Sequence, residues 1–286
     1  MNTNLKNGTD GRIVRITEAQ RAVEGDGFVV YRPFPTQHRS HIDPFLLLDQ
    51  MGPTDMSPGE GVGTPWHPHR GFETVTYMLE GEANHQDSIG NRGTIGPGDT
   101  QWMTAASGIL HKEGPTATTT RLHGLQLWVN LPAADKMGPP AYQDLRASEN
   151  AVLTTDTTTI RVIAGELFGL VGPGSTRTPI SYAHVTLARS ASVSTDLPEG
   201  HVVLVYPMTG TVSIQGVQVG ERTLAEVEGR TLTLTGASDS ADVIVLTGRP
   251  IGEPVARYGP FVMNTKAELH QAMADFDSGK FGAPAD

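Results

Sequence analysis

The sequence of 286 residues contains no cysteine. Disulfide bonds, thiolate metal ligands and a cysteine nucleophile are therefore excluded. Positive charge is also scarce, because 21 lysines and arginines are outnumbered by 31 aspartates and glutamates, which gives a net charge of −10. This acidity argues against direct binding of nucleic acid through phosphate neutralisation and favours small-molecule chemistry or a protein partner.

Long apolar runs are absent as well. No stretch reaches the roughly 18 apolar residues that a membrane span requires. The first ten residues, MNTNLKNGTD, are polar and lack the apolar core of a signal peptide. We therefore expect a cytoplasmic protein that does not bind membranes.

Helical patterns are scarce, whereas short β-type runs and turn residues are abundant. The 33 glycines and 20 prolines supply turns. Runs such as ETVTYMLEG (73–81), GLQLWVNL (124–131) and HVVLVYPMTGTVSI (201–214) have the composition of strands. The length suits two domains, and the second half loosely repeats the strand, glycine turn and strand of the first. These features predict an all-β protein made of two related β-barrels.

The segment LPAADKMGPPAYQDL (131–145) interrupts the β pattern with three prolines. It predicts a linker near residue 138. Residues 1–138 are then expected to form an N-terminal barrel, and residues 139–286 a C-terminal barrel that carries one terminal helix.

The end of the chain contains the strongest helix signals. Thr265 and Glu268 match a capping box, and Gly279 is a plausible stop signal. The apolar stripe of this helix is expected to consist of Leu269, Met273 and Phe276. We expect a docking helix without a catalytic role.

Two pairs of potential metal ligands occur in the first half, HPH at 67–69 and HKE at 111–113. Along a strand, residues i and i+2 point to the same face, with Cα atoms roughly 6.5–7 Å apart. His67 and His69 can therefore converge on one ion, and so can His111 and Glu113. If the strands are neighbours, this three-histidine, one-glutamate site suits Fe(II), Mn(II), Ni(II), Cu(II) or Zn(II). On spacing alone, surface histidines are the alternative interpretation.

Four long motifs resemble the pirin family of the cupin superfamily. They are HPHRGFETVTYMLEG (67–81), GDTQWMTAASGILHKEG (98–114), GLQLWVNLP (124–132) and GPFVMNT (259–265), in the family's order across nearly the whole chain. The resemblance implies two tandem cupin (jelly-roll-like) β-barrels. It also implies a single iron in the N-terminal barrel, held by His67, His69, His111 and Glu113. The second half has no HxH or HxE pair, so its barrel is expected to hold no metal.

The chain departs from the general cupin pattern at two places. Glu73 has the parity to face the same side as His69, but the pirin pattern places the ligand carboxylate at Glu113, so Glu73 is expected to support the site or the fold. Gln101 stands where the general second cupin motif has a histidine. As in pirins, the remaining ligands are therefore expected further downstream.

Other residues near these motifs allow two interpretations. His85 and Asp87 either line the pocket and hydrogen-bond the ligands or belong to an exposed turn. His123 is expected to be a structural histidine. Trp102 and Trp128 are expected to fill the barrel core rather than to contact a ligand.

The resemblance implies the chemistry of a quercetinase, a dioxygenase that opens the central ring of a flavonol with O2 and releases carbon monoxide. Fe(II) is the expected cofactor. Glu113 is the expected catalytic base, taking the proton of the flavonol 3-hydroxyl. The main alternative is a redox-responsive regulator that binds a transcription factor or a metabolic enzyme. A structural cupin without turnover and a zinc hydrolase or isomerase are further alternatives.

Overall fold

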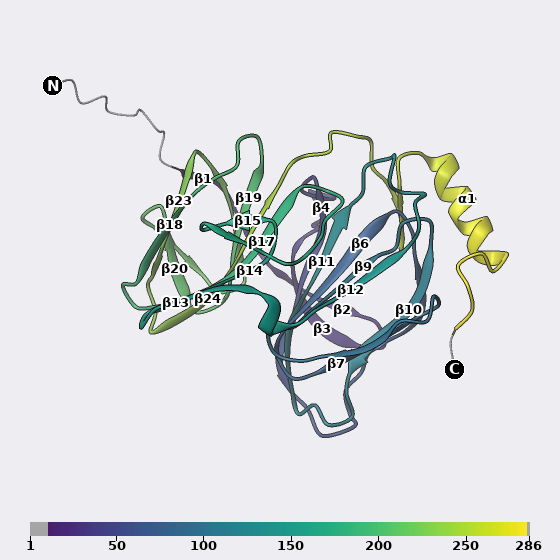
Figure 1. Cartoon of the computed structure of the whole chain (residues 1–286), viewed down its shortest axis with the longest axis horizontal. Helices are drawn as coiled ribbons and strands as arrows, with labels where there is room; N and C mark the ends of the chain where they lie inside the picture. The colour runs from purple at the N-terminus through teal and green to yellow at the C-terminus, as the bar shows by residue number, and fades with distance from the viewer. Residues whose placement is uncertain (1–10, 285–286) are drawn as a thin grey trace. The chain divides into compact units, whose positions relative to one another are not determined.

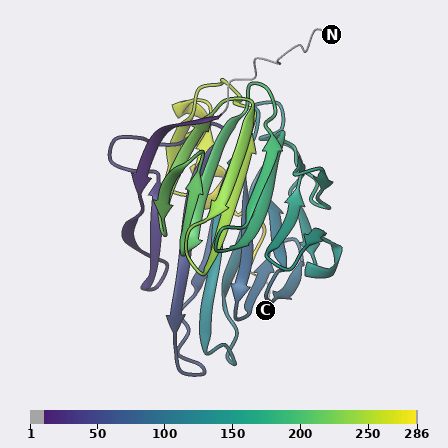
Figure 2. The same ribbon diagram turned by 90° about the vertical axis from the view of Figure 1, so that its left-hand side faces the viewer.

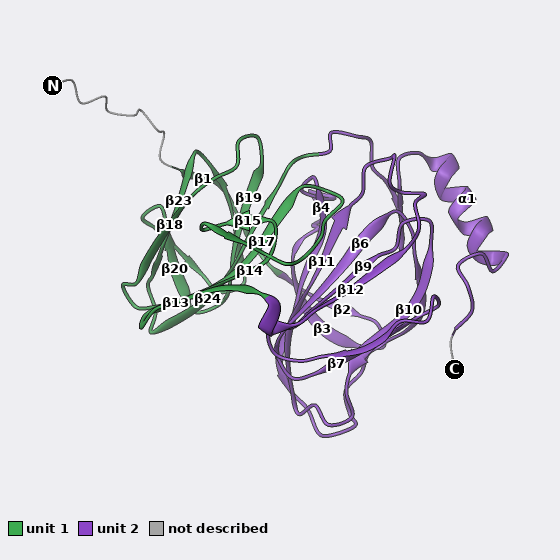
Figure 3. Cartoon of the chain, in the orientation of Figure 1, with its two compact units in different colours: residues 1–19, 150–250 green, residues 20–149, 251–286 purple. Residues whose placement is uncertain are grey.

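The computed structural model describes residues 11–284, and the chain divides into two compact units (Figures 1 and 3). Unit 1 combines residues 1–19 with 150–250, and unit 2 combines residues 20–149 with 251–286. Each unit contains one seven-stranded and one four-stranded antiparallel sheet. No helix within residues 11–284 is both long and apolar enough to cross a bilayer.

Unit 2 carries the histidine motifs. In sheet order, its seven-stranded sheet contains β12 (Ala141–Leu145), β9 (Thr100–Thr104), β6 (Phe72–Glu80), β11 (Arg121–Asn130), β4 (Phe45–Asp55), β3 (Phe28–Phe34) and β2 (Gln20–Glu24). Its four-stranded sheet contains β5 (Thr64–His69), β10 (Ile109–Pro115), β7 (Ala83–Asp87) and β8 (Arg92–Ile95). The unit also includes the short helix η1 (Ala147–Glu149), the hairpin of β25 (Ala256–Tyr258) and β26 (Phe261–Met263), and helix α1 (Lys266–Asp277).

Unit 1 repeats this plan. In sheet order, its seven-stranded sheet contains β1 (Arg12–Glu18), β22 (Thr223–Glu228), β19 (Val202–Thr209), β24 (Ser240–Gly248), β17 (Ile180–Ala188), β14 (Thr158–Ala164) and β13 (Ala151–Thr154). Its four-stranded sheet contains β18 (Ser192–Asp196), β23 (Thr231–Gly236), β20 (Thr211–Ile214) and β21 (Val217–Gly220). A two-stranded sheet pairs β15 (Glu166–Leu167) with β16 (Leu170–Val171). Figure 2 shows strands of the large sheet side by side, with the purple β1 at one edge.

The interior of unit 1 is formed by aliphatic side chains from both of its main sheets. Strand β23 shows why, because its leucines are buried while the intervening threonines are partly exposed, as a two-residue period dictates. Val185, Val205 and Val243 contribute to the same cluster from the larger sheet. This continuous apolar core accounts for the folding of unit 1 without any bound group.

The division expected at residue 138 differs from the observed one. Strand β1 pairs with β22 in unit 1, whereas the C-terminal hairpin and helix α1 belong to unit 2. The proline-rich segment is not a linker, since it leads into β12, which pairs with β9 at the edge of the unit 2 sheet. Pro139 and Pro140 are tolerated because they directly precede the edge strand β12 and remove no ladder hydrogen bond.

Helix α1 begins as the sequence predicts. Thr265 is the N-cap, and its side chain and that of Glu268 satisfy each other's backbone N–H groups in a capping box. The predicted apolar stripe is only partly correct. Phe276 is 38% exposed, whereas Asp275 is buried, because its carboxylate pairs with Arg70 of unit 2.

Candidate metal centre

The two histidine motifs lie on neighbouring strands. In the antiparallel ladder of β5 and β10, His111 is directly opposite His67, and Ile109 is opposite His69. The two-residue period of β5 directs His67 and His69 to the same face, as the sequence predicted. The intervening residues of the motifs, Pro68 and Lys112, do not belong to the resulting histidine cluster.

Three imidazoles converge at this point. One ring nitrogen from each of His67, His69 and His111 lies within 4.8 Å of the others, and this is the only such cluster of histidine or carboxylate side chains within residues 11–284. The ring centroids are 4.2 Å apart for His67 and His111, and 4.6 Å apart for His67 and His69. His69 and His111 are buried, whereas His67 is partly exposed. The cluster therefore lies at the inner end of a solvent-connected site.

Backbone carbonyl groups fix two of the imidazoles as potential ligands. The Nδ1 atom of His67 is 2.8 Å from the Pro65 carbonyl oxygen, and that of His69 is 3.4 Å from the Pro260 carbonyl oxygen. A carbonyl only accepts, so Nδ1 carries the proton in each ring and Nε2 carries the lone pair. The two Nε2 atoms are only 3.0 Å apart. Two lone pairs at this distance repel each other, and a shared cation would remove this repulsion.

The ring nitrogens of His111 also point to a bound cation. Both of its ring nitrogens are buried and have no hydrogen-bond partner among the described residues. Burial lowers the pKa of His111 well below the ordinary value, and the neighbouring His67 and His69 lower it further. Burial likewise lowers the pKa of His69, again aided by His67. Neutral imidazoles with free lone pairs fit a divalent first-row metal ion.

Glu113 lies beside this cluster but is not part of the group of atoms within 4.8 Å. A bulge interrupts the β5–β10 ladder between His111 and Glu113, so that Glu113 is opposite Thr64. Its carboxylate accepts hydrogen bonds from the Gln126 amide and, at 3.3 Å, from the Thr76 hydroxyl. The role of Glu113 as a fourth ligand therefore stays a prediction.

The orientation of Gln126 follows from its other neighbour. The Trp128 indole N–H can only donate, and it is 3.3 Å from Oε1 of Gln126. The Gln126 NH2 group must then point at Glu113, which places an acceptor oxygen of the carboxylate there. The series Trp128, Gln126 and Glu113 thus fixes the carboxylate beside the three imidazoles.

A cavity of about 290 Å³ opens onto the centre. His67, His69 and Glu113 lie on its wall, together with the aromatic rings of Phe28 and Trp128. The volume is near the lower end of the range for small-molecule sites, and the aromatic lining suits a planar ligand. Trp128 was expected to fill the core, but the structure places it on this wall, where it also packs against buried Phe72.

The cavity wall also carries charged side chains. Arg32 donates hydrogen bonds to Asp49 at 2.5 and 2.7 Å and to Glu24 at 2.5 Å. Burial raises the pKa of Asp49 in spite of its pairing with Arg32, whereas pairing with the two carboxylates raises the pKa of Arg32 although burial alone would lower it. Arg257, on strand β25, lines the same cavity.

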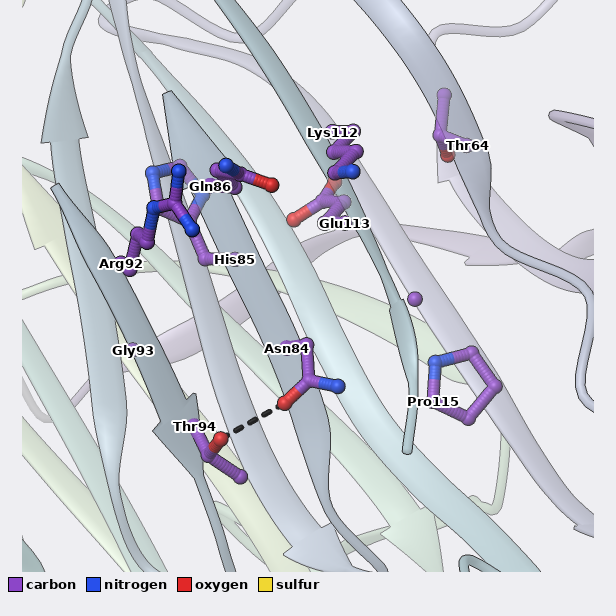
Figure 4. A pocket seen from close by; sticks show the side chains of 11 residues that line it. Thr64, Asn84, His85, Gln86, Arg92, Gly93, Thr94, Lys112, Glu113 and Pro115 are labelled. Atoms are coloured by element: carbon purple, nitrogen blue, oxygen red, sulfur yellow. Dashed lines mark hydrogen bonds between the residues drawn. The ribbon is translucent and has the colours of Figure 1, made fainter. Parts of the chain in front are cut away.

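A second, more open cavity of about 600 Å³ lies over strands β10, β7 and β8 (Figure 4). Its labelled side chains include the cationic Lys112 and Arg92, and Thr94 donates a hydrogen bond of 2.7 Å to Asn84. The three clustered histidines are not among its lining residues. Thr64 and Glu113 line both cavities, so the larger cavity adjoins the metal centre at Glu113 without reaching the imidazoles.

His85 and Asp87 are not in an exposed turn. Both are buried, Nε2 of His85 is 3.3 Å from the Asp87 carboxylate, and the ring centroids of His85 and His111 are 5.4 Å apart. Gln101, which replaces the general cupin histidine, is 2.5 Å from Nδ1 of His85. These side chains form a hydrogen-bonded layer behind His111.

The other interpretations made from the sequence were largely correct. Glu73 is buried and accepts a hydrogen bond of 2.7 Å from Thr104, which fits a supporting role. His123 is also buried, with Nε2 3.0 Å from the Gln50 amide, as expected of a structural histidine. Trp102 lies fully in the core.

Distant parts of the chain support the strand that ends in His69. Arg70, the next residue, donates to the Ser107 carbonyl at 2.6 Å and to Asp275 of helix α1 at 2.9 Å. The buried Lys136 donates to the carbonyls of Gly71 and Val262, and burial lowers its pKa to about 8. The segment after residue 250 thereby fixes the backbone directly after His69.

Sequence reasoning missed Gln126, Trp128, Arg257 and Pro260 as residues of the site. The signal for Gln126 and Trp128 was present, because both share one face of the strand GLQLWVNL. No local pattern pointed to Arg257 or Pro260, which reach the site from the far end of the chain.

Two similar sheet pairs in one chain, with a histidine cluster inside one of them, define the class of tandem cupin proteins, or bicupins. Residues 27–129 match the Pirin family, and residues 182–282 match the Pirin C-terminal cupin domain. The chain is 43% identical over 274 residues to "Putative quercetin 2,3-dioxygenase PA2418" of Pseudomonas aeruginosa, covering 92% of this chain and 95% of the relative. The chain belongs to the pirin family.

Two further comparisons agree. Human pirin is 37% identical over 286 residues, covering 96% of this chain and 95% of the human protein. The crystal structure of a quercetin 2,3-dioxygenase from Acinetobacter baumannii superposes with a TM-score of 0.90 at 39% identity, covering 96% of this chain and 99% of that one. The predicted cupin fold is therefore confirmed.

Proposed function

We propose that this protein is a metal-dependent dioxygenase of the quercetinase type, which opens the central ring of a flavonol with O2. The observation that carries the proposal is the cluster of three imidazoles, with unpartnered buried nitrogens on His111, at the end of a cavity lined by aromatic rings. The names of the relatives from Pseudomonas aeruginosa and Acinetobacter baumannii support the choice of reaction.

His67, His69, His111 and Glu113 are the proposed ligands, and Fe(II) is the proposed metal. Mn(II), Ni(II), Cu(II) and Zn(II) are compatible with the same donor types. When bound, the metal supplies a Lewis acid that acidifies the substrate hydroxyl and a redox centre for chemistry with O2.

The protein's own groups prepare the substrate. Glu113 takes the proton of the flavonol 3-hydroxyl, while the Gln126 amide holds the other side of its carboxylate. Trp128 and Phe28 bind the planar rings and displace water from the cavity. In the overall reaction, both atoms of O2 enter the ring-opened product and one ring carbon leaves as carbon monoxide, so that no further oxidant is needed.

Oxygen uptake by the iron-loaded protein tests the proposal. Quercetin addition is expected to consume one O2 per flavonol, with loss of the visible absorbance of quercetin and release of carbon monoxide. His69→Ala is expected to abolish turnover and metal binding. His41→Ala, which changes a loop histidine outside the cluster, is the matched control. Normal turnover by a metal-free His69→Ala protein would refute the scheme.

The alternative function, a regulator that responds to the redox state of its metal, gives a different result in the same experiment. It predicts stoichiometric metal without O2 consumption for any flavonol. It further predicts a co-purified protein partner whose affinity changes between Fe(II) and Fe(III).

A further inference from the structure

Arg257 differs from every other charged group on the cavity wall. The other arginine, Arg32, is neutralised by two carboxylates. Arg257 makes no ion pair with any described residue, and its one hydrogen bond among them runs from Nε to the Gly259 carbonyl at 3.5 Å. It is therefore a cation on the cavity wall whose donors are largely unused.

Aromatic stacking fixes the position of this cation. The guanidinium carbon of Arg257 lies 4.8 Å from the ring centroid of Trp128. Contact with the ring occupies the face of the guanidinium and leaves its N–H groups, which lie in the plane, available to a ligand. Trp128 in turn lies beside His69, with ring centroids 5.1 Å apart. The free donors are thus held close to the proposed metal centre.

The electrostatics around Arg257 allow it to bind a negatively charged group. Partial burial lowers the pKa of Arg257 and repulsion from Arg32 lowers it further, while Asp49 and Glu24, which form no ion pair with Arg257, offset this shift only in part. An anionic oxygen supplies further compensation, because a carboxylate or phenolate accepts charge-assisted hydrogen bonds from a guanidinium.

We infer that Arg257 is a substrate-binding residue that selects planar aromatic ligands bearing an anionic oxygen, namely phenolates, enolates and aromatic carboxylates, over their neutral analogues. The inference rests on the proposed function for the role of this cavity as the substrate site. It adds a specificity determinant that the HxH and HxE motifs do not contain.

Ligand binding without turnover tests the inference. The zinc-loaded protein, kept anaerobic, is titrated with quercetin, salicylate and the neutral methyl salicylate, with calorimetry or tryptophan fluorescence as the readout. Zinc has no redox chemistry, so binding is measured apart from oxidation. Arg257→Gln is expected to weaken salicylate and quercetin binding at least about tenfold and to leave methyl salicylate nearly unchanged. Arg257→Lys is expected to restore part of the loss.

Arg92→Gln is the matched control, because it removes the same charge from the wall of the larger cavity (Figure 4). It is expected to leave all three affinities unchanged. The inference is overturned if Arg257→Gln binds the anions as tightly as the wild type, if Arg92→Gln causes the loss instead, or if the wild-type protein binds none of the anions.

Failure of the proposed function gives a different pattern. The wild-type iron protein would then bind quercetin without consuming O2, while the dependence of anion affinity on Arg257 remained. A selective loss of anion binding in Arg257→Gln thus supports the inference whether or not turnover is observed.

Discussion

The two units share the same order of strands in their sheets, but their interiors contain different kinds of side chain. The four-stranded sheet β5-β10-β7-β8 of unit 2 corresponds in strand order to β18-β23-β20-β21 of unit 1. Where unit 2 places His67 opposite His111, the matching ladder of unit 1 places Thr195 opposite Leu232 and Val193 opposite Leu234. The paired positions of this sheet carry the clustered imidazoles in one unit and mainly apolar side chains in the other.

This difference shows what the fold requires and what it leaves free. Unit 1 is stabilised by a continuous aliphatic core that includes Leu232 and Leu234. Unit 2 also buries many apolar side chains, but its interior includes the three imidazoles and a cavity. Additional support comes from buried polar groups, including the contacts of Arg70 with Asp275 and of Lys136 with backbone carbonyls.

Introducing a histidine into unit 1 is expected to have the largest effect on stability. Leu234→His replaces a fully buried leucine by an imidazole without a partner, and we expect a loss of about 3 kcal/mol or more in the free energy of unfolding. Urea unfolding measures this loss. Thr233→His, on the outward face of the same strand, is the control and is expected to change the stability by less than about 0.5 kcal/mol. Equal losses in both variants would contradict the assignment of the core.

The reverse exchange replaces a histidine of the cluster by a leucine, the type of side chain that fills the interior of unit 1. His111→Leu is expected to weaken metal binding at least about a hundredfold, because a ligand is lost. The same change is expected to stabilise the metal-free protein by about 1 kcal/mol, since two buried nitrogens without partners are removed. Metal analysis and thermal unfolding measure the two effects.

His123→Leu is the control for this exchange. It removes another buried histidine, which is hydrogen-bonded to Gln50 and lies outside the cluster. We expect it to keep its metal and to lose stability. Stoichiometric metal in His111→Leu would show that this imidazole is not a ligand.

Unit 1 also contains a histidine beside a carboxylate, but there the two groups bind each other. Nε2 of His184 is 3.1 Å from Asp242, and Thr186 and Thr209 also donate to this carboxylate. Burial alone would raise the pKa of Asp242. The hydrogen bond and charge of His184, together with the hydrogen bonds of the two threonine hydroxyls, lower this pKa to about 2. Its ligand capacity is therefore already used within the protein.

The lowered pKa of Asp242 predicts a stability that depends on pH. An acid whose folded pKa lies below its unfolded value stabilises the fold when ionised, here by about 2 kcal/mol above pH ~4, and this contribution is lost as the pH falls towards ~2. The gap in unfolding free energy between wild type and Asp242→Asn is expected to be full at pH 7 and to shrink by roughly half at pH ~3. A gap that does not depend on pH would contradict this account.

Local periodicity explains how much of the site the sequence predicted. The spacing in HPH was sufficient to place His67 and His69 on one face, and the Thr265 capping box located the helix. The bulge before Glu113 was not predictable, because it depends on the register between β10 and a strand about forty residues away. Arg257 and the pairing of β1 with β22 were missed for the same reason, since both depend on contacts between distant segments.

The prediction with the smallest expected effect tests whether the position of Glu113 matters for activity when the metal is still bound. Gln126→Leu removes the amide that donates a hydrogen bond to the Glu113 carboxylate. The aliphatic core cluster of unit 1 contains no such amide. We expect kcat for quercetin to fall about tenfold, the factor that corresponds to one lost hydrogen bond, with the iron content unchanged. Gln86→Leu, in the larger cavity, is the control and is expected to retain full activity. An unchanged kcat would show that the carboxylate does not depend on Gln126, whereas a parallel loss of iron would mean that Gln126 acts by retaining a metal ligand.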